Sequence, residues 1–112
     1  MKELIKNLRN FAQKRDWDQF HSPKNLAMAL SVEVAELVEH FQWLTQAQSN
    51  NLDPVKLAAV KEEIADVMIY LTRLADRLGI DPVQAAEEKM RLNEKKYPVE
   101  KAKGNAAKYT DL

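Results

Sequence analysis

The sequence predicts an all-α fold, a four-helix bundle, and three observations support that prediction. Its 112 residues are 46% hydrophobic and 30% charged, a composition typical of an ordered domain rather than a disordered segment. Only two Gly and four Pro are present, which is too few turn residues for a many-stranded fold. No run of alternating polar and apolar residues is long enough to predict a strand. We expect helices at about residues 2–16, 23–47, 54–78 and 82–97.

The first expected helix, residues 2–16, carries charged residues among its apolar ones. It therefore lacks the continuous apolar segment of a signal peptide, and no part of the chain is apolar for the length of a membrane span. Seventeen basic and seventeen acidic residues give a net charge of zero, so no overall basic field favours polymeric nucleic acid or a membrane surface. The absence of Cys excludes disulfides, thiolate nucleophiles and Cys-ligated zinc. We expect a cytoplasmic protein.

The three later helices each begin at a capping residue followed by proline. The capping side chain accepts a hydrogen bond from a free amide of the first turn, and proline occupies a position whose amide has no partner. Gly79 stands where the third helix should end. After Pro98 no helical period is sustained, so we expect one domain over residues 1–98 and a tail over residues 99–112. The capped starts are Ser22-Pro23, Asp53-Pro54 and Asp81-Pro82.

The second and third helices each carry an apolar stripe at helical spacing, and we expect the two stripes to form the core. Further apolar residues lie on their opposite sides, which predicts that a second subunit covers one face. The alternative is that these are scattered surface apolar residues, with cover from the first and fourth helices. The stripes are Leu26, Leu30, Val34, Leu37, Phe41 and Leu44, and Leu57, Val60, Ile64, Val67, Leu71, Leu74 and Leu78; the opposite sides carry Met28, Val32, Val55 and Ile69.

Two pairs of carboxylates lie at the borders of these stripes. Glu33 and Glu36 are three residues apart on the second helix, and Glu63 and Asp66 are three apart on the third, so each pair shares one helix face. Antiparallel packing allows the pairs to face each other, and four close carboxylates need a compensating charge. Oxygen ligands favour Mg²⁺, with Mn²⁺ as a substitute. The alternative is that they are ordinary solvated acids, as we expect for Glu62.

Two further groups of residues suit a nucleotide. The fourth helix places hydrogen-bond donors on one face, suited to phosphate and sugar oxygens; the alternative is a solvated basic face. Aromatic and histidine side chains near the acids suit base stacking; the alternative is that they fill the core. The donors are Lys89, Asn93 and Lys96, with Tyr97 beside them, and the second group is Trp17, His21, Trp43 and Tyr70.

In their order along the chain, these segments resemble the MazG-like all-α nucleoside triphosphate pyrophosphohydrolases. The shared pattern is E-x-x-E, then E-x-x-D, then K-x-x-x-N-x-x-K-Y-P. The segments W-x-x-F-H, P-K-N-L-A, F-Q-W and K-Y-T-D-L are most similar to the dCTP pyrophosphatase branch. The resemblance implies a dimer or a dimer of dimers, Mg²⁺ dependence and nucleotide-pool house-cleaning. It also implies that Glu33, Glu36, Glu63 and Asp66 are metal ligands at the catalytic centre, and that the donors and aromatic residues above bind substrate.

The expected reaction is hydrolysis of a deoxynucleoside triphosphate to the monophosphate and pyrophosphate. dCTP or a related pyrimidine is the favoured substrate, and dATP is possible. We expect water to attack the α-phosphorus, with Glu36 as the general base. Two alternatives remain open, namely a non-catalytic helical module for oligomerisation and a pyrophosphohydrolase of another nucleotide such as phosphoribosyl-ATP.

Overall fold

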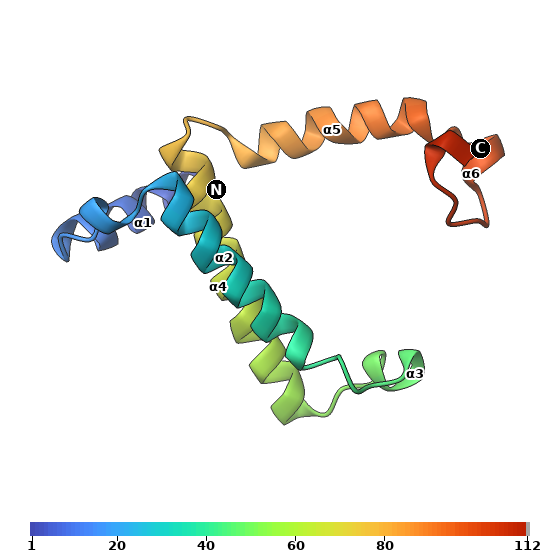
Figure 1. Ribbon diagram of the computed structural model, residues 1–112, viewed down its shortest axis with the longest axis horizontal. Coiled ribbons are helices and arrows are strands. Elements are labelled where there is room, and N and C mark those ends of the chain that lie inside the picture. The colour runs from blue at the N-terminus through green and yellow to red at the C-terminus, as the bar shows by residue number, and fades with distance from the viewer. Residues whose placement is uncertain (112) are drawn as a thin grey trace. The chain divides into compact units, whose positions relative to one another are not determined.

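The computed structural model describes residues 1–111, and Figure 1 shows that helices and the turns joining them make up this part of the chain. Four longer helices confirm the predicted all-α class and the expected order of elements. They are α1 (Lys2–Lys14), α2 (Pro23–Glu39), α4 (Pro54–Arg77) and α5 (Pro82–Lys96); shorter elements are α3 (Gln46–Ser49), α6 (Val99–Ala102) and the 3₁₀ turns η1 (Asp18–Phe20) and η2 (Tyr109–Asp111). Among the described residues, no helix combines the length and apolar character that crossing a bilayer requires.

The chain separates into two compact units, Met1–Gly79 and Ile80–Leu112. The first holds α1 to α4, and the second holds α5, α6 and η2. The expected division into a domain over residues 1–98 and a tail over residues 99–112 stays a prediction. Within that expected tail, α6 and η2 give local structure, and its last residue, Leu112, lies outside the described residues.

The proline-marked helix starts are all confirmed. The side chain of Ser22 accepts a hydrogen bond from the amide of Asn25 at 3.1 Å. Asp53 accepts one from the amide of Lys56 at 2.8 Å, and Asp81 caps α5 in the same way. These caps satisfy amides that the first turn leaves without a helical partner. Gly79, just after α4, has a φ of +70°, a left-handed conformation that glycine adopts without a steric penalty.

The second helix ends earlier than expected, so its predicted extent to residue 47 is wrong. α2 stops at Glu39, turns follow, and α3 begins after Thr45. The Thr45 side chain accepts a hydrogen bond from the amide of Gln48 at 3.1 Å, and the Gln48 side-chain oxygen accepts one from the amide of Thr45 at 2.9 Å. This reciprocal capping box starts a new helix at that point, which divides the expected single helix in two.

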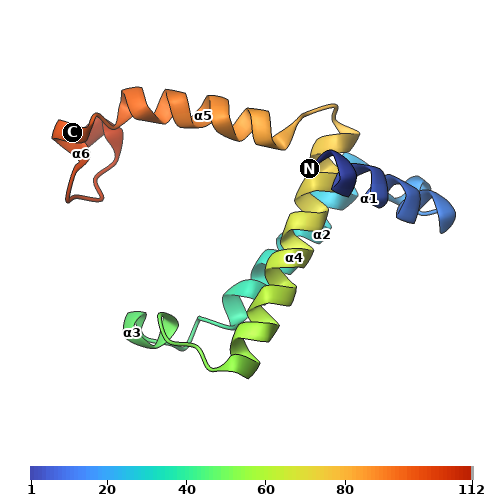
Figure 2. The same ribbon diagram turned by 180° about the vertical axis from the view of Figure 1, so that it is seen from behind.

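The core of the first unit forms where α2 and α4 pack side by side and antiparallel, as Figures 1 and 2 show from opposite sides. Leu26 and Val60 are buried there. The expectation that both complete stripes form this core is wrong, because the contact is centred on the neighbouring faces that carry Glu33 and Glu63, both half-buried. Each stripe therefore lies partly beyond the contact. The exposed members are Val34 of the first stripe and Leu57, Ile64, Leu71 and Leu78 of the second. The opposite sides of the two helices expose Met28, Val32, Val55 and Ile69.

Helix α1 packs against the C-terminal part of α4. Ala12 is buried in this contact. Arg9 of α1 donates two hydrogen bonds to Asp76 of α4, at 2.8 Å from Nε and 2.5 Å from Nη2. The paired guanidinium holds the pKa of Asp76 below its usual value, because a bound cation favours the charged carboxylate. This contact places the loop after α1 beside α4.

In the second unit, aromatic contacts connect the end of α5 to η2. The rings of Tyr97 and Tyr109 meet edge to face with centroids 6.1 Å apart. The Lys96 ammonium lies 4.9 Å from the centroid of the Tyr109 ring, a distance at which the cation is attracted to the ring face.

Candidate functional site

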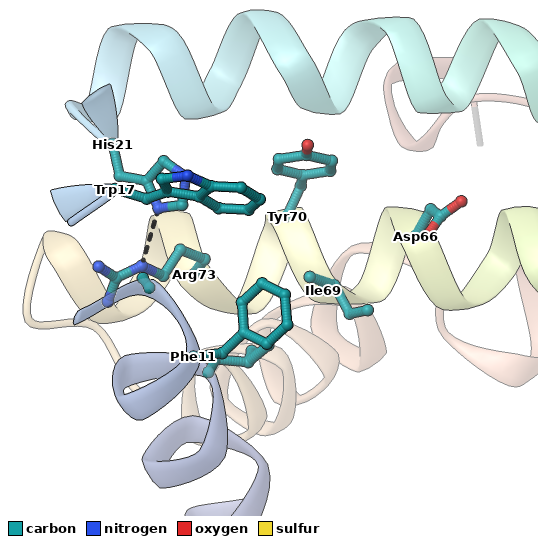
Figure 3. A pocket seen from close by; sticks show the side chains of 9 residues that line it. Phe11, Trp17, His21, Asp66, Ile69, Tyr70 and Arg73 are labelled. Atoms are coloured by element: carbon teal, nitrogen blue, oxygen red, sulfur yellow. Dashed lines mark hydrogen bonds between the residues drawn. The ribbon is translucent and has the colours of Figure 1, made fainter. Parts of the chain in front are cut away.

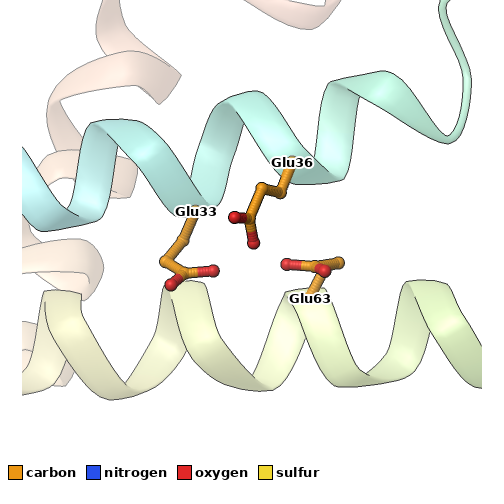
Figure 4. Close-up of side chains that lie close together, drawn as sticks. All are labelled: Glu33, Glu36 and Glu63. Atoms are coloured by element: carbon orange, nitrogen blue, oxygen red, sulfur yellow. The ribbon is translucent and has the colours of Figure 1, made fainter.

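Three carboxylates meet across the α2–α4 contact. Glu33 and Glu36 project from α2 and Glu63 from α4, as Figure 4 shows. One carboxylate oxygen from each residue lies within 4.8 Å of the other two, and all three side chains are half-buried. Glu62, at the adjacent position, is exposed as expected. Helical spacing on α2 and antiparallel packing against α4 thus bring together three of the four predicted metal ligands.

Among the residues that the structure describes, two oxygens of this cluster are buried and have no hydrogen-bond partner. They are Oε2 of Glu33 and Oε2 of Glu63. A buried acceptor left unpaired is unfavourable by about 1–3 kcal/mol or more. Protonation or a bound cation removes that penalty, and hard divalent cations such as Mg²⁺ prefer carboxylate oxygens. The donor set therefore fits a divalent metal ion.

Electrostatics in the cluster favour the same interpretation. The pKa of Glu33 is raised to about 7, first by burial and then by the neighbouring Glu36, Asp66 and Glu63. Burial, followed by Glu36 and Asp66, also raises the pKa of Glu63. Near neutral pH, Glu33 is therefore partly protonated, because it is removed from water and lies beside other acids. A bound cation reverses this balance by favouring the ionised forms.

Asp66, the fourth predicted ligand, lies one turn along α4 and is not one of the three clustered residues. It is half-buried, and its charge acts on both Glu33 and Glu63. Asp66 also lines a neighbouring pocket. It therefore stands between the carboxylate cluster and that pocket, while its expected role as a metal ligand stays a prediction.

The pocket has a volume of about 160 Å³ and lies between α1, the loop after it, and α4. Figure 3 shows aromatic side chains gathered along it. The ring of Trp17 meets Phe11 and His21 edge to face, with centroids 5.6 Å and 6.1 Å away. Three of the predicted nucleotide-contacting residues are thus in one place. The lining residues are Leu8, Phe11, Ala12, Trp17, His21, Asp66, Ile69, Tyr70 and Arg73.

The other predicted binding residues are not among those that line this pocket. Trp43 follows α2, is 87% exposed and does not line this pocket. Lys89, Asn93 and Lys96 on α5, with Tyr97 at its end, belong to the second unit. Their contacts with substrate stay predictions.

Residues 28–112, which include all four predicted metal ligands, match the sequence model of the MazG-like family. The chain belongs to the MazG-like family. A crystal structure of a pyrophosphatase from Archaeoglobus fulgidus has the same fold, with a TM-score of 0.83 and 46% sequence identity over 88% of this chain and 92% of that one. The MazG-like identity and the all-helical fold expected from the motifs are thus confirmed.

Among named relatives, dCTP pyrophosphatase 1 of Rattus norvegicus is 48% identical to this MazG-like chain, and the Homo sapiens protein of the same name is 45% identical. Both matches extend over 104 residues, which is 91% of this chain. The chain spans 61% of the length of each of these relatives.

The structure of this MazG-like chain also shows pocket residues that the sequence analysis missed. Arg73 is 6% exposed and lines the pocket beside Tyr70. Helical spacing alone places Arg73 on the same face of α4 as Asp66 and Tyr70. The sequence did not mark it as a pocket residue, because an arginine is most often exposed. Phe11 was missed because nothing in the sequence of its helix indicates a contact with Trp17 in the loop that follows.

Proposed function

We propose that this chain hydrolyses a deoxynucleoside triphosphate to the monophosphate and pyrophosphate, with dCTP or a related pyrimidine nucleotide preferred. One observation carries the proposal: a carboxylate cluster with unpaired buried oxygens adjoins an aromatic pocket through Asp66. The names of the dCTP pyrophosphatase relatives and of the archaeal pyrophosphatase support it. Because every member of the cluster is acidic, it suits a metal-bound triphosphate better than a free anion.

Mg²⁺ is the proposed cofactor, held by Glu33, Glu36 and Glu63, with Asp66 as the fourth ligand. When bound, it neutralises phosphate charge and lowers the pKa of a water molecule. Mn²⁺ is a suitable substitute because it also prefers oxygen ligands. The two unpaired oxygens of Glu33 and Glu63 are the atoms whose burial this ion would compensate.

The carboxylates also supply a general base. We assign this role to Glu36, which takes a proton from the attacking water while the oxygen of that water bonds to the α-phosphorus. The bond from that phosphorus to the bridging oxygen breaks, and pyrophosphate leaves with the electron pair. Proton acceptance by a positioned carboxylate contributes to the rate because it assists charge development at the water oxygen.

The pocket is the proposed site for the base. Trp17 and Tyr70 offer ring faces, and His21 offers a polar edge. Stacking on aromatic side chains favours binding of any base, so the choice among bases depends on polar contacts. Substrate binding is also proposed for Trp43 and for the donors on α5, Lys89, Asn93 and Lys96 with Tyr97, which suit sugar and phosphate oxygens.

We also propose that the chain works as a homodimer or homotetramer. Leu57, Ile64 and Leu71 on one side of α4, and Leu78 at its end, are exposed, and clustered exposed apolar residues often mark a contact with another subunit. The proposed cellular role is the removal of unwanted triphosphates from the nucleotide pool of the cytoplasm.

The deciding experiment measures pyrophosphate release from a panel of common and modified deoxynucleoside triphosphates and from phosphoribosyl-ATP. We expect Mg²⁺-dependent release, fastest with dCTP or a related pyrimidine, and loss of release in a metal chelator. Thermal stabilisation by nucleotide plus Mg²⁺ is measured in parallel. No hydrolysis and no stabilisation with any nucleotide would favour the non-catalytic module, whereas selective hydrolysis of phosphoribosyl-ATP would favour that other substrate.

A further inference from the structure

A buried arginine contacts the histidine of the pocket. Arg73 is 6% exposed, and its Nη2 donates a hydrogen bond to a carboxylate oxygen of Asp18 in η1. Its Nε donates to Nδ1 of His21 at 3.4 Å, the dashed line in Figure 3. Its Nη1 lies 3.7 Å from Oδ2 of Asp76. The guanidinium is thus held between two carboxylates, which orients its Nε toward the imidazole.

This contact determines where the imidazole carries its proton. Every guanidinium nitrogen is a donor and none accepts. Nδ1 of His21 must therefore accept from Arg73, so Nδ1 has no proton, and a neutral imidazole of this kind carries its proton on Nε2. An imidazolium would need a second proton on Nδ1, directed at a cation.

The surroundings of His21 favour the same neutral state. Burial lowers the pKa of His21, and the positive charges of Arg73 and Arg77 lower it further, while Asp18 opposes them. Trp17 packs edge to face against the ring and adds no charge. A neutral ring at the working pH is thus consistent with the hydrogen bond to Arg73.

We propose that Arg73 is a positioning residue that fixes His21 as an Nε2–H donor to the pocket, and that the group it binds is a hydrogen-bond acceptor on the nucleobase. Nδ1 is already occupied, so Nε2 is the ring nitrogen left for a ligand. The nature of the ligand rests on the proposed function, whereas the proton position rests on the Arg73 contact alone. A cytosine ring offers acceptors of this kind at its O2 and N3 atoms.

The proton position is tested by NMR of the full chain labelled with ¹⁵N-histidine. The chain has two histidines, so a His40→Gln variant assigns the signals. We expect His21 at neutral pH to show a protonated Nε2 and an unprotonated Nδ1. A proton on Nδ1 of the wild-type ring overturns the inference. This measurement uses the wild-type ring, so it does not depend on whether a variant of Arg73 folds.

Two variants separate the hydrogen bond from the charge. Arg73→Leu removes both, and we expect it to raise the pKa of His21 and to populate the Nδ1–H form. Arg77→Leu is the matched control on the same helix, because it removes a nearby charge but no hydrogen bond to His21. We expect Arg77→Leu to leave the proton on Nε2. An equal change of tautomer in both variants would show that charge alone acts and would overturn the role of Arg73.

Kinetics test the contact with the base. We expect Arg73→Leu to raise KM for the preferred triphosphate by about tenfold while kcat changes by less than about twofold, since a contact to a non-reacting group of the substrate contributes mainly to binding. Arg77→Leu should leave both unchanged. A fall in kcat with KM unchanged overturns the base contact. If the wild type hydrolyses no triphosphate, the proposed function and the base contact fail together, and the NMR result still decides the proton position.

Discussion

Glu33 of α2 and Glu63 of α4 each bury one carboxylate oxygen, Oε2, that has no hydrogen-bond partner within residues 1–111, although the two side chains share one cluster. The arrangement opposes stability in the absence of a cation, because both residues lose hydration and repel each other. A bound cation would offset both costs.

Replacing Glu63 with Gln removes a charge from the cluster but preserves the shape of the side chain. We expect Glu63→Gln to raise the melting temperature of the metal-free protein, because it relieves repulsion, and to reduce the stabilisation that Mg²⁺ provides. Glu62→Gln is the matched control, because Glu62 is exposed on the next position. Calorimetry with Mg²⁺ and with a chelator makes the comparison, and identical behaviour of the two variants would contradict the metal site.

The proposed general base is tested by Glu36→Gln. We expect kcat to fall by about 10²–10⁴-fold, the usual contribution of a positioned base, with an unchanged far-UV circular dichroism spectrum. Hydrolysis in ¹⁸O-labelled water should place the label in the monophosphate. Full activity of the variant argues against Glu36, and label in pyrophosphate alone argues against attack at the α-phosphorus.

The raised pKa of Glu33 predicts how metal-free stability depends on pH. Its pKa is about 7 in the folded chain against an ordinary value of 4.5, so the folded state binds its proton more tightly than the unfolded state. Stability is therefore greatest below about pH 4.5 for this group and is lost as the pH rises through about 7. Melting temperatures in a chelator should fall over this range, and less so in Glu33→Gln. Equal slopes for both proteins would show that Glu33 is not the cause.

The cap of α4 predicts a measurable loss of stability. Asp53→Ala removes the acceptor for the Lys56 amide, and we expect the free energy of unfolding to fall by about 1 kcal/mol, with a range of about 0.5–2 kcal/mol. Asp53→Asn should retain most of the stability, since Asn caps helices about equally well. Chemical denaturation measures both variants, and an equal loss in the two would point to the charge of Asp53 rather than its capping bond.

The exposed apolar row on α4 predicts self-association. We expect Ile64→Glu to shift the chain toward the mass of a single 12.9 kDa subunit in analytical ultracentrifugation, because a buried unpaired charge disfavours an interface. Glu62→Lys, an exposed change on the opposite side of α4 from this row, should leave the mass unchanged. If the wild-type chain is already monomeric at high concentration, the proposed assembly is contradicted.

Much of this fold is predictable because its determinants are local. A capping side chain followed by proline fixes the start of a helix within a few residues, which is why α2, α4 and α5 begin where the sequence predicts. The carboxylates were also predictable, since Glu33 and Glu63 lie at similar offsets from their apolar stripes. In contrast, the end of α2 depends on competition between continuing that helix and starting another at Thr45, and helical periodicity alone does not resolve it.

The pocket was harder to predict because it depends on contacts between distant segments. Arg73 and His21 are brought together only when the loop after α1 lies against α4, and no spacing within one helix reports that contact. The pairing of α2 with α4 also decides which face of each helix is buried. The α2–α4 contact takes in half-buried acids and leaves Ile64 and Leu71 exposed, a rotation that a single helical wheel does not reveal.

Leu57, Ile64, Leu71 and Leu78 recur every seventh residue along α4. Seven residues fall about 20° short of two full turns of a straight α-helix, so the row drifts slowly around the helix axis. A helix that follows the row from Leu57 to Leu78 must therefore cross α4 at about +20° and wind around it in a left-handed supercoil.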